Sequence, residues 1–217
     1  MKTINTNYPF VKSNFIEKCI FCLKILFVFI FTMFLIIVKI FCDFLLPKYS
    51  IHVPQIFHKL LVWMINIKII VEGKIAKENK GLLFVSNHLS YIDIPILGSL
   101  MSVKFVAKNE IARWPIIGRL AKMGNTIFIK RIKSNLVKEK DIIQKELNLG
   151  FRVILFPEGT TSDGIRVLKF KSSLLSSIEK NNYQIQPIVI NYERINGFPL
   201  NRWLKPIIAW YGDMGLK

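Results

Sequence analysis

The sequence predicts an α/β fold in which a mixed β-sheet is layered with helices and is preceded by a membrane-embedded helix and an amphipathic helix. Two observations carry this prediction. Short runs rich in Val, Ile and Phe alternate with amphipathic stretches of helical length over most of the chain, and such alternation is typical of sheets covered by helices. Near the N-terminus, residues 25–38 read ILFVFIFTMFLIIV without a single charge. The 217 residues are enough for one well-buried domain and an appendage.

Composition narrows the class of protein before any motif is considered. Hydrophobic residues make up 52% of the chain, and 31 Lys and Arg residues against 14 Asp and Glu residues give a formal charge of +17. A chain this apolar is not disordered, and its basic excess disfavours a plain cytosolic enzyme. The combination fits an anionic membrane surface, with nucleic acid as the alternative partner for the charge.

The first element is a long apolar segment, residues 19–46, which is interrupted only by Lys24, Lys39 and Asp43. Because about 20 helical residues cross a bilayer core, this segment is long enough to span a membrane. No small-x-small cleavage site follows it, which favours a retained anchor over a signal peptide. Lysines are nearly balanced on its two sides, so charge does not fix the orientation. A helix that enters and leaves on the same face stays open.

The second element is residues 51–65, IHVPQIFHKLLVWMI, which predicts an amphipathic helix lying in the membrane interface. We therefore assign residues 1–66 to a membrane-anchoring helical region. Residues 67–217 are assigned to the α/β domain.

Within that domain, the alternating pattern places the elements in order. Strands are expected at 67–71, 82–86, 104–107, 126–129, 152–156, 185–190 and 207–211. Helices are expected at 90–101, 111–123, 134–149 and 172–180. The best-marked helix begins with Ser134 as its N-cap and stops at Gly150 as its C′ residue, positions that favour these residue types.

Polar residues follow the strand at 82–86 in the sequence NHLSYID. The carboxyl end of a strand is where the sites of α/β sheets gather. His88 lies just before a helix and Asp93 in its first turn, so the carboxylate can fold back onto the imidazole and leave the other ring nitrogen free to accept a proton. The alternative is structural, because Ser90-x-x-Asp93 is a capping box and His88 then is an ordinary loop residue. The two roles are compatible.

A second group, FPEGTTSDG, follows the strand at 152–156. Gly159 and Gly164 suit a loop whose backbone N–H groups face an anion, and Glu158 is placed to accept a hydrogen bond from a substrate hydroxyl. The alternative is a plain turn. The spacing is not a phosphate-binding P-loop, because the Lys-Ser/Thr pair that must follow Gly164 is absent.

A third group, GNTIFIKR, is a strand that ends in Lys130 and Arg131. Arg131 can bind a phosphate in a bidentate manner, or it is a solvated charge at a strand end. The basic stretch around it, residues 104–145, fits anionic lipid headgroups, a polyphosphate cofactor or an acidic carrier protein. A solvated helix face is the alternative.

The sequence offers no metal site and no reactive thiol. His52, His58 and His88 lack ligand-like spacing with Cys, Asp or Glu. Cys19 and Cys22 spell C-x-x-C inside the apolar segment, where we interpret them as small hydrophobic residues. Cys42, the third cysteine, lies in the same segment, so neither a disulfide framework nor a catalytic cysteine is predicted.

The three motifs together, as NHLSYID, FIKR and FPEGTTS, resemble the N-H-x-x-x-x-D, F-I-x-R and F-P-E-G-T blocks of the lysophosphatidate (1-acyl-sn-glycerol-3-phosphate) acyltransferase family. The run IQPIV at 185–189 is similar to the family's short strand with an internal proline, and the resemblance covers roughly residues 67–213. It implies that residues 67–217 form an acyltransferase catalytic domain, with His88 as the general base and Asp93 as its partner. The substrate contacts that it implies are Arg131, Glu158, Gly159, Thr160 and Lys169.

The resemblance has one departure that bears on the substrate. Many members have Arg where this chain has Thr161, so a cation that contacts phosphate is missing there, and Lys169 or Lys171 are the candidates to replace it. The T-T-S-D-G form also looks like the branch that includes lyso-ornithine-lipid acyltransferases.

The resemblance implies transfer of a fatty acyl group from acyl-CoA or acyl carrier protein to the free hydroxyl of a lysolipid. We expect the acceptor to be 1-acyl-sn-glycerol-3-phosphate, giving phosphatidic acid, with lyso-ornithine lipid as the alternative. A non-catalytic, basic membrane-surface binding protein and a hydrolase are the remaining alternatives.

The same comparison sets the expected surroundings of the reaction. No cofactor beyond the acyl donor, no metal and no nucleic-acid partner are expected. Because both donors are cytosolic, we expect the catalytic domain on the cytoplasmic face of the membrane. The sequence leaves the oligomeric state open.

Overall fold

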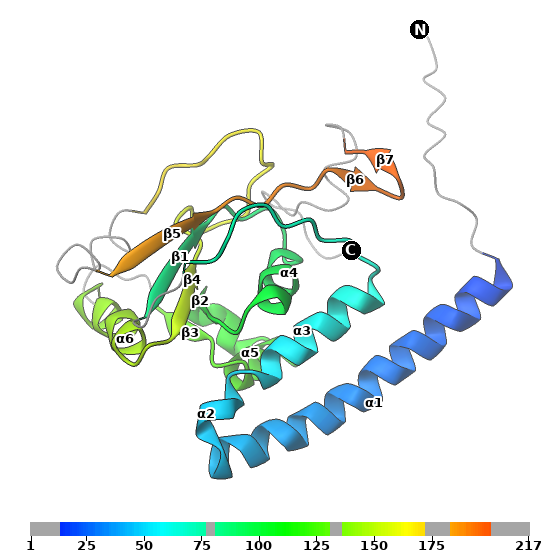
Figure 1. Ribbon diagram of the computed structural model, residues 1–217, viewed down its shortest axis with the longest axis horizontal. Coiled ribbons are helices and arrows are strands. Elements are labelled where there is room, and N and C mark those ends of the chain that lie inside the picture. The colour runs from blue at the N-terminus through cyan, green and yellow to red at the C-terminus, as the bar shows by residue number, and fades with distance from the viewer. Residues whose placement is uncertain (1–13, 77–80, 131–135, 172–182, 201–217) are drawn as a thin grey trace, which may run out of the picture.

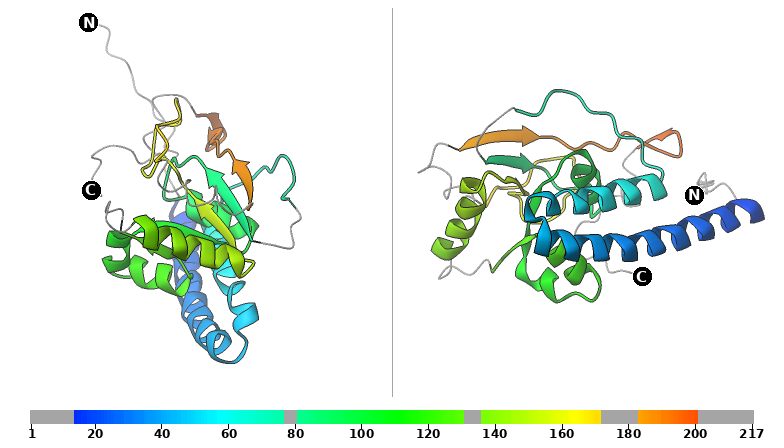
Figure 2. Two further views of the ribbon diagram at one scale, coloured as in Figure 1. Left: turned by 90° about the vertical axis from the view of Figure 1, so that its left-hand side faces the viewer. Right: turned by 60° about the horizontal axis from the view of Figure 1, so that its bottom comes forward.

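The computed structural model describes residues 14–76, 81–130, 136–171 and 183–200. Three helices come first: α1 (Phe15–Leu45), α2 (Pro47–Ser50) and α3 (Val53–Met64). They are followed by a sheet with helices on both of its faces (Figures 1 and 2). This order of elements confirms the α/β class and the helical N-terminal region. The boundary between residues 66 and 67 stays a prediction.

Among the described residues, the sheet has five strands in the order β3-β2-β4-β1-β5, and every pairing among them is parallel. Its strands are β1 (Leu82–Ser86), β2 (Lys104–Lys108), β3 (Ile127–Ile129), β4 (Arg152–Leu155) and β5 (Gln184–Ile188). The connections include α4 (Asp93–Leu100), the 3₁₀ helix η1 (Asn109–Arg113), α5 (Ile117–Met123) and α6 (Leu136–Asn148). A separate antiparallel pair follows, β6 (Arg194–Ile195) with β7 (Phe198–Pro199).

Strand β1 lies inside the sheet between β4 and β5 and is buried on both faces. Its sequence, LLFVS, is apolar almost throughout, as is usual for parallel sheets. Successive side chains point to opposite faces. Phe84 packs in a core with Leu97 of α4, whereas Leu83 packs in a second core with Ile143 and Leu147 of α6. The two cores place α4 and α6 on opposite faces of the sheet, and α4 is the helix that begins at Asp93.

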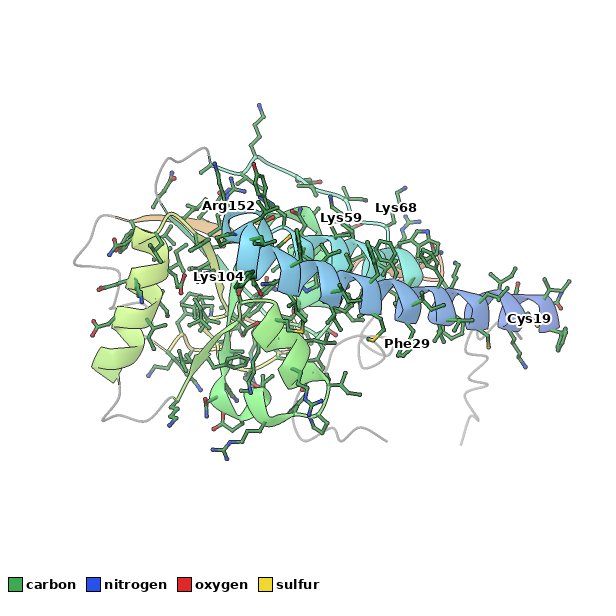
Figure 3. The ribbon with its side chains drawn as sticks, turned by 90° about the horizontal axis from the view of Figure 1, so that it is seen from below. Cys19, Phe29, Lys59, Lys68, Lys104 and Arg152 are labelled. Atoms are coloured by element: carbon green, nitrogen blue, oxygen red, sulfur yellow. The ribbon has the colours of Figure 1, made fainter. Side chains whose placement is uncertain are left out.

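The long helix α1 has 31 residues and is the one helix in the described part of the chain that is long and apolar enough to cross a membrane, with a mean hydropathy of 2.9 over 18 residues. Part of it packs against α3 through a small cluster that includes Leu35, Cys42 and Val53. The N-terminal end of α1, where Cys19 lies, extends past the rest of the described chain (Figure 3). Most of its apolar side chains are exposed to the surroundings, as expected of a helix embedded in lipid.

Two of the expected elements are wrong. Residues 67–71 form no strand, and Ile70 and Val71 are mostly exposed. Residues 74–76, a little further along the chain, instead contact β5 through the side chain of Gln186. Its amide accepts a hydrogen bond from Ala76 N (2.9 Å) and donates one to the Lys74 carbonyl (2.8 Å).

The helix expected at 111–123 is divided into η1 and α5. Pro115 lies between them, and the residue before a proline is disfavoured in the helical region. Ile116, which follows it, has a φ of +58°. The expected N-cap Ser134, the helix at 172–180 and the strand at 207–211 lie outside the described residues.

Candidate active site

The site is built at the carboxyl end of β1, where the side chain of Asn87 extends the pairing with β5. The Asn87 amide donates to the Ile190 carbonyl (3.0 Å), and Ile190 N donates back to Asn87 Oδ1 (2.8 Å). These two hydrogen bonds continue the contact between the two strands beyond the last paired residues. They therefore fix the backbone immediately before His88.

His88 and Asp93 are in direct contact. His88 Nδ1 lies 2.7 Å from Asp93 Oδ2, and the same oxygen accepts hydrogen bonds from Leu89 N (2.6 Å) and Ser90 N (3.0 Å). Asp93 is fully buried, whereas the His88 side chain keeps 15% of its surface exposed. A proton on Nδ1 that is donated to the carboxylate leaves Nε2 as the basic ring nitrogen.

The predicted capping box is present in part. Helix α4 begins at Asp93, with Ile92 as its N-cap residue. The Asp93 carboxylate accepts from Ser90 N, which is one half of a capping box. The Ser90 hydroxyl accepts from Ile92 N at 3.4 Å rather than from Asp93 N, which bonds to the Ser90 carbonyl. One carboxylate thus both holds the start of the helix and contacts the imidazole.

A third side chain completes the surroundings of Asp93. The Tyr192 hydroxyl donates to Asp93 Oδ1 at 2.5 Å. Burial, followed by the charge of Asp93 and the hydrogen bond to it, raises the pKa of Tyr192 above its usual value, so the phenol stays a donor. Sequence reasoning missed Tyr192, which lies 99 residues from Asp93. The one local signal was its position just after the strand with an internal proline.

The loop that follows β4 covers His88. Because β4 is the parallel neighbour of β1, the two strands end side by side. The ring of Phe156 stacks on His88 with centroids 4.1 Å apart and an interplanar angle of 17°. Ser162 N donates to the His88 carbonyl at 2.8 Å. At Gly164 a Cβ would lie 2.8 Å from a methyl carbon of Leu89, and the φ of +69° favours glycine at this position.

Within that loop, Glu158 is 2% exposed. Its Oε2 accepts from Leu168 N (3.1 Å), while Oε1 has no hydrogen-bond partner among the described residues. Gly159 N donates to the Phe156 carbonyl, and Gly164 N lies 3.4 Å from the Ser162 hydroxyl. Both N–H groups are therefore directed at other atoms of the same loop. The buried acceptor that lacks a partner among the described residues is Oε1 of Glu158.

The other expected substrate contacts are less closely gathered. Thr160 and Lys169 are exposed, and Thr161 is half-buried. Arg131 lies outside the described residues. The strand that precedes it, β3, is separated from β1 by β2 and β4, about 14 Å across the sheet at the usual strand spacing.

A pocket of about 310 Å³ lies at the amino ends of β1 and β4, at the opposite end of these strands from His88. It is lined by Leu82 and Arg152, which begin β1 and β4, and by His52 and Ser102. None of the site residues that the sequence predicts lines it. In the described part of the chain, no three His, Cys, Asp or Glu side chains cluster as metal ligands would.

The fold and the site define an α/β protein with an apolar N-terminal helix and a histidine–aspartate pair at the carboxyl end of an inner strand of its parallel sheet. Comparison with known proteins gives the family. The chain belongs to the Acyltransferase family, whose model matches residues 68–191, and the predicted resemblance is thereby confirmed.

Two kinds of relative illustrate the match. The chain is 36% identical over 187 residues to the lyso-ornithine lipid O-acyltransferase of Rhizobium meliloti (strain 1021), covering 82% of this chain and 64% of that protein. It is 30% identical over 146 residues to the 1-acyl-sn-glycerol-3-phosphate acyltransferase of Neisseria gonorrhoeae, covering 66% of this chain and 55% of that protein. The chain therefore aligns with less than two thirds of the length of these relatives.

A solved structure supports the fold. The crystal structure of the 1-acyl-sn-glycerophosphate acyltransferase PlsC from Thermotoga maritima matches with a TM-score of 0.59 at 24% identity, over 77% of this chain and 73% of that one. At this identity the likeness concerns the arrangement of helices and strands.

Proposed function

We propose that the protein transfers a fatty acyl group from a thioester donor to the free hydroxyl of a lysolipid, with His88 as the general base. The observation that carries the proposal is the contact between His88 Nδ1 and the buried Asp93 carboxylate. It directs the basic Nε2 away from Asp93. Membership in the Acyltransferase family supports the same reaction.

The reaction follows from these groups. Nε2 of His88 takes the hydroxyl proton while the hydroxyl oxygen forms a bond to the thioester carbonyl carbon. The negative charge of Asp93 stabilises the imidazolium that results. The carbon–sulfur bond then breaks, and the departing thiolate takes the proton from His88. Acyl-CoA and acyl carrier protein are donors of this chemical class. Because both are cytosolic, we propose that the catalytic domain faces the cytoplasm.

For the acceptor we propose a lyso-ornithine lipid. The R. meliloti relative carries that name and aligns over more of this chain, at higher identity, than the N. gonorrhoeae relative. Thr161 fits this acceptor, because a headgroup without phosphate does not need the Arg that many family members have there. The unpartnered Glu158 Oε1 suits a hydroxyl or an ammonium donor from the acceptor.

A second candidate acceptor is 1-acyl-sn-glycerol-3-phosphate. The similarity to the N. gonorrhoeae enzyme supports it. Lys169 is exposed beside the loop that follows β4 and is available for a phosphate. In this case Arg131 is the second cation to consider.

The test uses membranes that contain the wild type, His88→Ala or His52→Ala, with labelled acyl-CoA or acyl carrier protein and each lysolipid in turn. His52 is a matched control because it contacts Ser102 at the far edge of the sheet. We expect labelled diacyl product from the wild type and His52→Ala but not from His88→Ala. Transfer that survives in His88→Ala would overturn the role of His88. Absence of product from the wild type with both acceptors would overturn the proposed reaction.

A further inference from the structure

Tyr192 lies outside the motifs that the sequence singles out, yet it is part of the site. Its hydroxyl is 2.5 Å from Asp93 Oδ1. The ring packs against the buried core cluster that includes Leu89, Phe156 and Ile190. Tyr192 is thus both packed and hydrogen-bonded in one place.

The two oxygens of Asp93 have different partners. Oδ2 accepts from His88 Nδ1 and from two backbone N–H groups, of Leu89 and Ser90. Across the described residues, the one hydrogen bond to Oδ1 comes from Tyr192. A buried carboxylate oxygen without a donor is costly, so the loss of this hydroxyl affects Oδ1 and leaves the Oδ2 contacts in place.

The backbone holds Tyr192 at Asp93. Two residues before it, both the N–H and the carbonyl of Ile190 are bonded to the Asn87 amide. Asn87 is itself the residue before His88. The segment that follows β5 is therefore tied to the end of β1 twice, once beside His88 and once at its partner.

We propose that Tyr192 is a positioning residue that acts on His88 through Asp93. By donating to Oδ1, it fixes the rotation of the carboxyl group so that Oδ2 faces Nδ1 of the imidazole. It also takes up part of the carboxylate charge, so the imidazolium is stabilised without holding its proton too tightly to return it to the thiolate. The inference rests on the proposed function, in which His88 is the base.

The test compares Tyr192→Phe with Tyr183→Phe in the full-length chain in detergent. Tyr183 is a matched control, because it precedes the other end of β5 and its hydroxyl bonds to the Asn148 side chain. The first readout is the NMR titration of the imidazole nitrogens. The chain has three histidines, and the loss of a signal in His88→Ala assigns the one of interest. The second readout is the pH dependence of kcat/KM.

We expect the titration midpoint of His88 to rise in Tyr192→Phe, because the Asp93 carboxylate loses the one donor to its Oδ1 atom among the described residues. With its donor gone, the carboxylate attracts the imidazolium proton more strongly, so the acidic limb of kcat/KM moves to higher pH. We expect kcat to fall about tenfold with the KM for the lysolipid unchanged. We expect Tyr183→Phe to leave the His88 midpoint, the acidic limb of kcat/KM, kcat and KM as they are.

Other titratable groups near the site do not alter the difference between Tyr192→Phe and Tyr183→Phe. Glu158 and Asp163 lie in the loop after β4, and Glu193 follows Tyr192. All three are present in both variants, so their protonation contributes equally. An unchanged His88 midpoint in a folded Tyr192→Phe protein would overturn the proposal and leave Tyr192 a role in stability alone.

A double variant tests the same link by kinetics alone. If Tyr192 acts through Asp93, then adding Tyr192→Phe to Asp93→Asn lowers kcat no further, and additive losses would contradict the proposal. Because the NMR titration needs no turnover, it separates the two claims. If the wild type has no transferase activity but the His88 midpoint still changes in Tyr192→Phe, the proposed function is refuted. The effect of Tyr192 on His88 through Asp93 is then retained.

Discussion

Asp93 is a fully buried carboxylate whose partners other than His88 are uncharged donors. They are two backbone N–H groups and the Tyr192 hydroxyl. Hydrogen bonds of this kind stabilise a buried carboxylate without neutralising it. The negative charge therefore remains available to an imidazolium at His88, which a lysine or arginine in contact with Asp93 would have cancelled.

Replacing Asp93 by Asn tests this charge with little change in shape. The amide oxygen can still accept from His88, and the amide nitrogen can donate to the Tyr192 oxygen. We expect the fold to be retained while the transfer rate falls by about 10²- to 10⁴-fold, measured as kcat/KM on reconstituted membranes. Asp141→Asn, on the exposed face of α6, is the matched control. An Asp93→Asn rate within twofold of wild type would contradict a role for the charge.

At the residue scale, sequence reasoning reached the contacts that are local. His88, Ser90 and Asp93 lie within one short segment, so strand-to-helix geometry was enough to bring them together. Tyr192 could not be reached in this way, because its place beside Asp93 depends on the pairing of β5 with β1 and on the Asn87 amide. The orientation of Glu158, with one oxygen bonded and one open, likewise depends on the path of residues that follow it.

At the scale of elements, α4 links the N-terminal helices to the site. It begins at Asp93, and at Gly98 it meets α3 so closely that a Cβ would lie 1.8 Å from His58 Nδ1. Gln55 of α3 donates to the Ser99 carbonyl (3.1 Å) and accepts from the Ser102 hydroxyl (2.6 Å). The helix that carries Asp93 is therefore held against α3 by close packing and by two hydrogen bonds of Gln55.

The contact between α3 and α4 should weaken in acid. Burial lowers the pKa of His58 from 6.5 to about 4, an effect that a hydrogen bond with the Gly98 backbone partly offsets. Between these values the unfolded chain binds a proton that the folded chain does not, so the free energy of unfolding falls as the pH is lowered from 6.5 to 4. The loss from this group is at most about 3 kcal/mol.

Chemical unfolding of the detergent-solubilised protein between pH 7 and pH 4.5 measures this effect. We expect His58→Gln to lose less stability over the range than the wild type, and His52→Gln, at an exposed position, to follow the wild type. Equal slopes for all three proteins would show that His58 does not titrate in this way.

The elements that the sequence located best are those whose burial is uniform. β1 and β4 are apolar runs covered on both faces, so hydrophobicity alone identifies them. Residues 67–71 are equally apolar, but they pair with no strand, and hydrophobicity does not distinguish exposure to lipid or solvent from burial in a sheet. The sequence predicts one helix over 111–123, whereas Pro115 separates η1 from α5 in the structure.

At the scale of the whole molecule, α1 lies alongside the domain rather than standing away from it. Its contacts with α3 extend from Lys24 and Phe27, beside Trp63, to Cys42, beside Val53, and α3 packs in turn on α4. Lys59 on α3 is exposed, and in the view from below it lies on the side of α1 away from Phe29 (Figure 3). If α1 were perpendicular to the membrane plane, Lys59 on the adjacent α3 would lie in the hydrocarbon core. This burial would cost about 3 kcal/mol or more.

This arrangement predicts that α1 enters and leaves on one face of the bilayer. All three cysteines of the chain lie on α1, so a variant that keeps Cys19 alone reports the position of its N-terminal end. We expect a membrane-impermeant maleimide to label Cys19 from the side that carries the catalytic domain. The two sides are compared in sealed vesicles of both orientations. A second variant that keeps only Cys42, which is buried, is the control for background labelling. Labelling of Cys19 from the opposite side alone would establish a spanning helix.

The strand order also has a consequence for the order in which the protein matures. Both neighbours of β1 come later in the chain, and β5, which precedes Tyr192, is the last strand of the sheet among the described residues. During synthesis the N-terminal part leaves the ribosome first, so α1 is available to lipid before β5 is available to pair with β1. The hydrogen bond from Tyr192 to Asp93 therefore forms after α1 has become available to lipid, because that bond requires β5 to pair with β1.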